Sequence, residues 1–229
     1  MAARPDLLSH ALLRDLQRDH AERLQAVMRP QGWDAGQLVF QRGDPGSFMA
    51  FIVSGKVQLS LLSPGGKEIL LRHVGPGGVL GEIAVIDGGD RSADARAAVA
   101  TEAMILTRKA FLSVADEMPG LYGAIARYLC AALRATNYQM ESIALYDLRA
   151  RLARFFLMTC GPQGPSVRPL RVEMAYTQGE LSALLGASRP KLNAALHLLQ
   201  SDGAITRDGS GYLCDRARLE ALAEPDDAG

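Results

Sequence analysis

The sequence predicts an α+β fold in three parts: a β-rich N-terminal half, one long helix, and a C-terminal group of short helices with a β-hairpin. Three observations predict it. Thirteen of the 23 glycines lie between Gly32 and Gly89; residues 120–146 contain no proline and no glycine after Gly123; and two closely spaced helical patterns follow residue 176. The 229 residues are enough for two domains. We place the boundaries at residues 1–119, 120–147 and 148–229.

Short apolar runs between glycines predict the strands of an antiparallel barrel or sandwich in the N-terminal half. These runs are Leu38–Phe40, Phe48–Val53, Lys56–Leu62, Glu68–Val74 and Val79–Ile86. The segment Leu7–Met28, which precedes them and carries leucines at positions 12, 13, 16 and 24, is predicted to be helical.

The long helix carries a seam at coiled-coil spacing. Its residues are separated by 4, 3, 4, 4, 3 and 4 positions: Ile125, Leu129, Ala132, Thr136, Met140, Ile143 and Asp147. A helix over residues 120–146 is roughly 40 Å long, which favours packing against a partner helix over packing on the chain's own barrel. We therefore predict a homodimer with a hinge at Asp147, where the helix ends.

The C-terminal part shows the pattern of a winged helix-turn-helix. Thr177 to Glu180 forms a T-x-x-E capping box, Gly186 ends that helix, and Ser188 can cap the next one with Pro190 in its first turn. The inner stripe of the second helix is Leu192, Ala195, Leu196 and Leu199, and the turn Asp208–Gly211 predicts a hairpin after it.

The outer face of the second helix carries basic and small residues, which suit the major groove of double-stranded DNA. The net charge of the chain is zero, but residues 149–218 hold ten Lys and Arg against five Asp and Glu. A winged helix used only for protein contacts is the alternative. The candidate DNA-binding residues are Thr177, Gln178, Ser188, Arg189, Pro190, Lys191, Asn193, His197 and Arg207.

A second candidate site combines Gly81-Glu82-Ile83-Ala84 with Arg91-Ser92-Ala93. Gly81 lets the backbone approach a ligand, Glu82 can accept from a ribose hydroxyl, and Arg91 can hold a phosphate with its fork of donors. Ser92 and the amides beside it add donors in a tight turn. A purely structural Glu82–Arg91 ion pair is the alternative.

The segment GEIAVIDGGDRSADARA resembles the phosphate-binding cassette of cyclic-nucleotide-binding domains, and Gly43–Gly46 and Ser54–Val57 fit their β-roll. With the long helix and helix-turn-helix in this order, nearly the whole chain resembles the cyclic AMP receptor protein family (CRP/FNR). The resemblance implies a homodimeric transcription regulator controlled by cyclic AMP. It also implies a pseudo-palindromic DNA site and RNA polymerase as a partner.

The ligand-binding residues implied by the resemblance are Gly81, Glu82, Ile83, Ala84, Arg91, Ser92, Ala93, Thr136 and Asn137. Glu82 would bind ribose, Arg91 and Ser92 the cyclic phosphate, and Thr136 and Asn137 the adenine from the two subunits. Asn137 departs from the serine of the best-known member, so cyclic di-GMP, another effector or no effector stay open. Arg189 matches the guanine-reading arginine, but Pro190 and Ala194 replace a carboxylate and an arginine, which predicts a different DNA site.

Several classes are set aside. No cysteine precedes Cys130, which argues against the iron-sulfur cluster of oxygen-sensing relatives, and His10, His20 and His73 show no pattern of haem ligands. No metal-ligand spacing, Ser/His/Asp order or P-loop indicates an enzyme. The segment before Leu38 has no apolar run as long as the core of a signal peptide, and no apolar run in the sequence is as long as a membrane span. We therefore expect a cytoplasmic protein without membrane contact.

Overall fold

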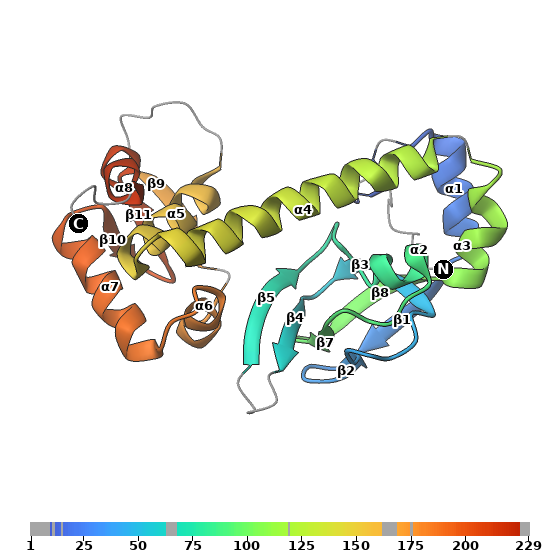
Figure 1. Ribbon diagram of the computed structural model, residues 1–229, viewed down its shortest axis with the longest axis horizontal. Coiled ribbons are helices and arrows are strands. Elements are labelled where there is room, and N and C mark those ends of the chain that lie inside the picture. Colours follow the sequence, from blue (N-terminus) through green and yellow to red (C-terminus); the bar gives the residue numbers. More distant parts are fainter. Residues whose placement is uncertain are drawn as a thin grey trace. The chain divides into compact units, whose positions relative to one another are not determined.

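The computed structural model describes residues 10, 12–14, 16–62, 68–118, 120–161, 169–174 and 176–224. The chain divides into two compact units, Met1–Leu133 and Arg134–Gly229. Figure 1 follows the chain through a β-rich first unit, helix α4 and a mainly helical second unit. Among the described residues, no helix combines the length and apolar character needed to cross a membrane.

The first unit is built on two four-stranded antiparallel sheets, which confirms the antiparallel barrel or sandwich predicted for this half. One sheet has the order β1-β8-β3-β6, with strands Arg29–Trp33, Thr101–Thr107, Phe48–Ser54 and Val79–Leu80. The other has the order β2-β7-β4-β5, with strands Leu38–Phe40, Asp94–Ala97, Val57–Leu62 and Glu68–Val74.

Strand β3 is buried on both faces because its side chains alternate between two cores. Ala50 and Ile52 belong to the core that the two sheets share, while Met49 and Phe51 belong to a core covered by helices. Those helices are α1 (Arg18–Ala26), α3 (Arg108–Ala115) and the first turns of α4. Burial on both faces explains why the sequence of this strand is an almost uninterrupted run of apolar residues.

Two expectations for the first unit are wrong. The helix expected over Leu7–Met28 is confined to α1 in the described residues, because Leu12 and Leu13 are buried in a turn; residues 1–9, 11 and 15 lie outside them. The strand expected over Val79–Ile86 ends at Leu80, where Gly81 takes a φ of +76° and helix α2, Glu82–Asp87, follows. Strands β1 and β7 carry few large apolar residues, so the pattern did not predict them.

Helix α4, Leu121–Leu145, confirms the long helix expected over residues 120–146. Its first turns are buried in the helix-covered core: Ile125 is a core residue and Leu129 packs against the same core. Beyond them Met140 and Ile143 are exposed. The alternative in which the seam packs on its own barrel is therefore right for the first turns, and the predicted partner helix concerns the seam from Ala132 onward.

The second unit forms around Phe156, which is fully buried and whose ring meets Tyr212 edge-on at 5.3 Å between centroids. The predicted inner stripe of the second helix is buried in this core. The elements after α4 are α5 (Leu148–Cys160), β9 (Leu170–Glu173), α6 (Gln178–Leu184), α7 (Arg189–Ser201), β10 (Ile205–Asp208), β11 (Gly211–Cys214) and α8 (Arg216–Ala223). The strands form one sheet in the order β10-β11-β9, so the predicted hairpin is confirmed.

The two helices of the helix-turn-helix differ in how their N-termini are capped. The predicted capping box is present: Glu180 N donates to Thr177 Oγ1 at 3.2 Å, and Thr177 N donates to Glu180 Oε2 at 2.6 Å. Ser188 is the N-cap residue of α7, as predicted, but its side chain makes no capping hydrogen bond. Pro190 removes one of the two amides that such a cap would bind.

Candidate functional site

The candidate ligand site centres on Arg91, whose side chain is enclosed by aromatic rings. Its Cζ atom lies 4.2 Å from the ring centroid of Phe40 on β2 and 4.6 Å from that of Phe48 on β3. Its Nη1 donates to the Gly81 carbonyl at 3.0 Å, and its backbone amide donates to the Asp44 carbonyl at 2.8 Å. These contacts hold the guanidinium in one position at the start of α2.

The guanidinium of Arg91 has donors left over. The residue is only 3% exposed, and its Nε and Nη2 atoms have no hydrogen-bond partner among the described residues. Burial lowers the pKa of Arg91, and the nearby Asp44 and Glu82 carboxylates act in the opposite direction. A buried cation with unpaired donors is costly, so a bound anion would stabilise it.

Two glycines make room for this arrangement. A Cβ atom on Gly81 would lie 2.3 Å from Arg91 Nη1 and 3.1 Å from the Phe48 carbonyl, and its φ of +76° disfavours other residues. A Cβ atom on Gly46 would lie 2.2 Å from the Ala84 Cβ atom in α2. The segment from Gly43 to Gly46 therefore packs directly against the short helix that carries Glu82.

Glu82 is buried beside a second arginine. Its Oε1 lies 3.8 Å from Nη2 of Arg72 on β5, and the side chains are 5% and 44% exposed. Burial raises the pKa of Glu82, whereas its own backbone amide, Arg72 and Arg91 lower it. Tyr128 on α4 stands next to the pair: it donates to the Val79 carbonyl at 3.4 Å and is hydrogen-bonded to Arg72. Among the described residues, Glu82 therefore forms an ion pair with Arg72 and not with Arg91.

The other predicted ligand residues fall into two groups. Ala84 and Ala93 are buried, and Ile83 and Ser92 are exposed. Thr136 and Asn137 are exposed on α4 and belong to the second unit. The structure brings Gly81, Glu82 and Arg91 together, and the roles of Thr136 and Asn137 stay a prediction.

The candidate DNA-binding residues of the helix-turn-helix are exposed on or next to α6 and α7. The exposed members are Thr177, Gln178, Ser188, Arg189, Pro190, Lys191, Asn193 and His197. The Arg189 guanidinium lies over Gly179 of α6, where a Cβ atom would be only 2.6 Å from Nη2. Arg207 on β10 is held by Tyr212, with its Nη1 donating to the phenol at 3.3 Å and its Cζ 5.5 Å from the ring centroid.

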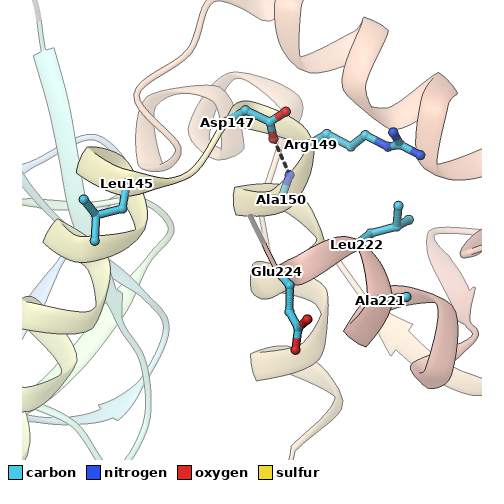
Figure 2. A pocket seen from close by; sticks show the side chains of 7 residues that line it. All are labelled: Leu145, Asp147, Arg149, Ala150, Ala221, Leu222 and Glu224. Atoms are coloured by element: carbon cyan, nitrogen blue, oxygen red, sulfur yellow. Dashed lines mark hydrogen bonds between the residues drawn. The ribbon is translucent and has the colours of Figure 1, made fainter. Parts of the chain in front are cut away.

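The predicted hinge lies between α4 and α5. Asp147 is the N-cap of α5, and its carboxylate accepts from the Ala150 amide at 2.8 Å (Figure 2). A hollow of about 260 Å³ adjoins it, lined by Leu145, Asp147, Arg149, Ala150, Ala221, Leu222 and Glu224.

Arg154 of α5 ties the last turns of α4 to α5 across this junction. Its Cζ lies 4.1 Å from the ring centroid of Tyr146 and 4.4 Å from that of Tyr138, and its Nη2 is 3.3 Å from Glu141 Oε1. We expect Arg154→Met to lower the free energy of unfolding by about 1–2 kcal/mol, because desolvated cation–π contacts contribute on that scale. Calorimetric unfolding measures it. Arg134→Met, an exposed arginine on α4, is the control, and equal stability of the two variants would contradict the bracing role.

Residues 30–118 match the cyclic nucleotide-binding domain, and residues 150–222 match the Crp-like helix-turn-helix domain. The CRP-like cAMP-activated global transcriptional regulator of Mycobacterium tuberculosis is 32% identical over 198 residues, which cover 86% of this chain and 88% of that protein. The structure of the Thermus thermophilus catabolite activator protein is 27% identical, with a TM-score of 0.54 over 93% of this chain and 98% of that one. The c-di-GMP responsive regulator CLP of Xanthomonas campestris shares the fold. It is 23% identical, with a TM-score of 0.70 over 86% of this chain and 99% of that one.

A cyclic nucleotide-binding domain followed by a helix-turn-helix defines a ligand-responsive, DNA-binding transcription regulator. The chain belongs to the CRP/FNR family of such regulators. The members of this family are transcription regulators rather than enzymes, and membership supports a dimer.

Sequence reasoning missed four side chains of the ligand site: Phe40, Phe48, Arg72 and Tyr128. The two phenylalanines gave no local signal, because they lie 51 and 43 positions before Arg91 and meet it only when the chain folds back. Arg72 did give a local signal, since it is a charged residue directly after the apolar run Ile69–Leu71 of β5.

Proposed function

We propose that cyclic AMP is the effector of this regulator and binds beside Arg91. The observation that carries the proposal is the buried guanidinium with two donors unpaired among the described residues. Arg91 would bind the cyclic phosphate and Glu82 a ribose hydroxyl, with Ser92 adding a donor. The cAMP-activated relative in Mycobacterium tuberculosis supports this choice of nucleotide.

The domains of the proposed mechanism are residues 1–119 for ligand binding, 120–147 for dimerisation and the hinge, and 148–229 for DNA binding. Thr136 and Asn137 would contact the base from the two subunits, and Asp147 would be the hinge. The effector favours the arrangement in which both α7 helices fit successive major grooves of a pseudo-palindromic site, about 34 Å apart. RNA polymerase is the proposed partner at the promoter, and the cytoplasm is the proposed compartment.

Calorimetric titration of the intact chain with cyclic AMP, cyclic GMP and cyclic di-GMP tests the effector. We expect cyclic AMP to bind, and DNA affinity measured with and without it to differ, because only a ligand that distinguishes two states can shift them. Cyclic di-GMP, to which the Xanthomonas regulator responds, is the alternative. DNA binding unaffected by all three nucleotides would favour an effector-independent regulator.

The surface of α7 predicts different roles for two neighbouring cations. Arg189 in the first turn can donate to O6 and N7 of guanine, so Arg189→Ala should cost about 1–3 kcal/mol and relax preference at one base pair per half-site. Lys191 would contact a phosphate, so Lys191→Ala should weaken binding to all sequences and reduce the salt slope by about one. Selection of sites from random DNA and affinities at several salt concentrations measure both effects.

Each of these two variants is the control for the other, since both residues are exposed on the same helix. If Lys191→Ala changed the selected sequence while Arg189→Ala left it unchanged, the orientation proposed for α7 on DNA would be wrong.

A further inference from the structure

We propose that Arg72 is a specificity-determining residue, which contacts the base of the bound nucleotide and increases affinity for guanine relative to adenine. The inference rests on the proposed function, because it assumes that a cyclic nucleotide lies beside Arg91 and Glu82. As a consequence, the difference in affinity between cyclic AMP and nucleotides that carry guanine is smaller with Arg72 than without it.

Arg72 is a partly exposed residue beside the buried Glu82. Its strand β5 pairs with β4, with Arg72 opposite Leu59, and its Nη2 reaches to 3.8 Å from the buried Glu82 carboxylate. A hydrogen bond links it to Tyr128, whose hydroxyl is in turn within 3.4 Å of the Val79 carbonyl. A carboxylate on one element and a phenol on another thus hold a guanidinium that is still 44% exposed.

Two of the three charged side chains are buried, and the third reaches solvent. Arg91 is 3% exposed and Glu82 4%, whereas the side chain of Arg72 is nearly half exposed. A cyclic nucleotide presents phosphate, ribose and base in that order. If the phosphate meets Arg91 and a ribose hydroxyl meets Glu82, the next group outward is the base, at the place where Arg72 and Tyr128 stand.

The chemistry of arginine then selects among bases. Its guanidinium has five donors and no acceptor. Guanine offers two neighbouring acceptors, O6 and N7, which match the fork, while adenine offers N7 beside the N6 amino donor. A base edge presented to Arg72 is therefore bound better when it belongs to guanine, in cyclic GMP or in cyclic di-GMP.

A merely structural role for Arg72 makes a different prediction. If Arg72 only holds the Glu82 carboxylate in place, its loss weakens the binding of every ribose-containing nucleotide by the same factor. Lysine keeps the positive charge near Glu82 but lacks the planar fork, so Arg72→Lys separates the two roles.

The test is calorimetric titration of the intact chain, Arg72→Lys and Arg72→Leu with cyclic AMP, cyclic GMP and cyclic di-GMP. We expect both variants to raise the Kd of cyclic GMP by about tenfold, and that of cyclic AMP by less than about threefold. Arg96→Lys, an exposed arginine on β7 that donates to the Gly36 carbonyl, is the control and should change none of them. The unaltered chain's response to cyclic di-GMP tells which guanine nucleotide is the relevant one.

The outcomes separate this inference from the proposed function. If both variants weakened the binding of cyclic AMP and cyclic GMP equally, or left the ratio of their Kd values unchanged, the role of Arg72 would be overturned. The proposed effector site would then still stand. Binding of no nucleotide by the unaltered chain would overturn the proposed effector site and this inference with it.

Discussion

Arg91→Leu should weaken binding of cyclic AMP by about ten- to a hundredfold while leaving the chain folded. Charge-assisted hydrogen bonds to a phosphate contribute roughly 1.5–3 kcal/mol, and leucine offers none. The fold should tolerate the change, because the new side chain would still contact the rings of Phe40 and Phe48. The substitution also removes a buried cation whose Nε and Nη2 atoms have no hydrogen-bond partner among the described residues, which relieves a cost of burial. Calorimetric titration and thermal unfolding measure the two effects separately.

The matched control is Arg96→Leu, the same substitution at an exposed arginine of the neighbouring strand β7. It should leave the affinity for cyclic AMP unchanged. An unchanged affinity in Arg91→Leu would falsify the phosphate-binding role of this residue.

Met140→Glu should convert a dimer to monomers and weaken binding to a two-half-site DNA by about 10²- to 10⁴-fold, because the two half-sites would no longer be bound as one event. Met140 is 66% exposed in the single chain, so the substitution costs the isolated subunit little. In a symmetric seam, however, each new carboxylate would be buried opposite its own copy. Sedimentation measures the oligomeric state, and titration with a palindromic duplex measures the DNA affinity.

Ala131→Glu is the control, since it is exposed on α4 but lies well away from the seam. Leu129 is a poorer site for this test because it packs against the chain's own helix-covered core, so a charge there would also disturb the subunit. A parent protein that sediments as a monomer at micromolar concentration would refute the dimer.

Local patterns were sufficient for much of the fold. The strand Glu68–Val74, the long helix and the capping box at Thr177 were predictable, because each depends on side chains a few positions apart. Gly81 is a partial case. Its importance was visible, but its positive φ ends strand β6 and begins α2, which apolar periodicity could not reveal.

The candidate site divides in the same way. The sequence by itself determined that Glu82 and Arg91 lie close together, since one short segment carries both. Only the tertiary structure decided that Arg91 is enclosed by Phe40 and Phe48, and that Glu82 pairs with Arg72 instead. The reason is that these contacts join different strands, and their distances depend on how the sheets pair and close, which no local pattern of residues specifies.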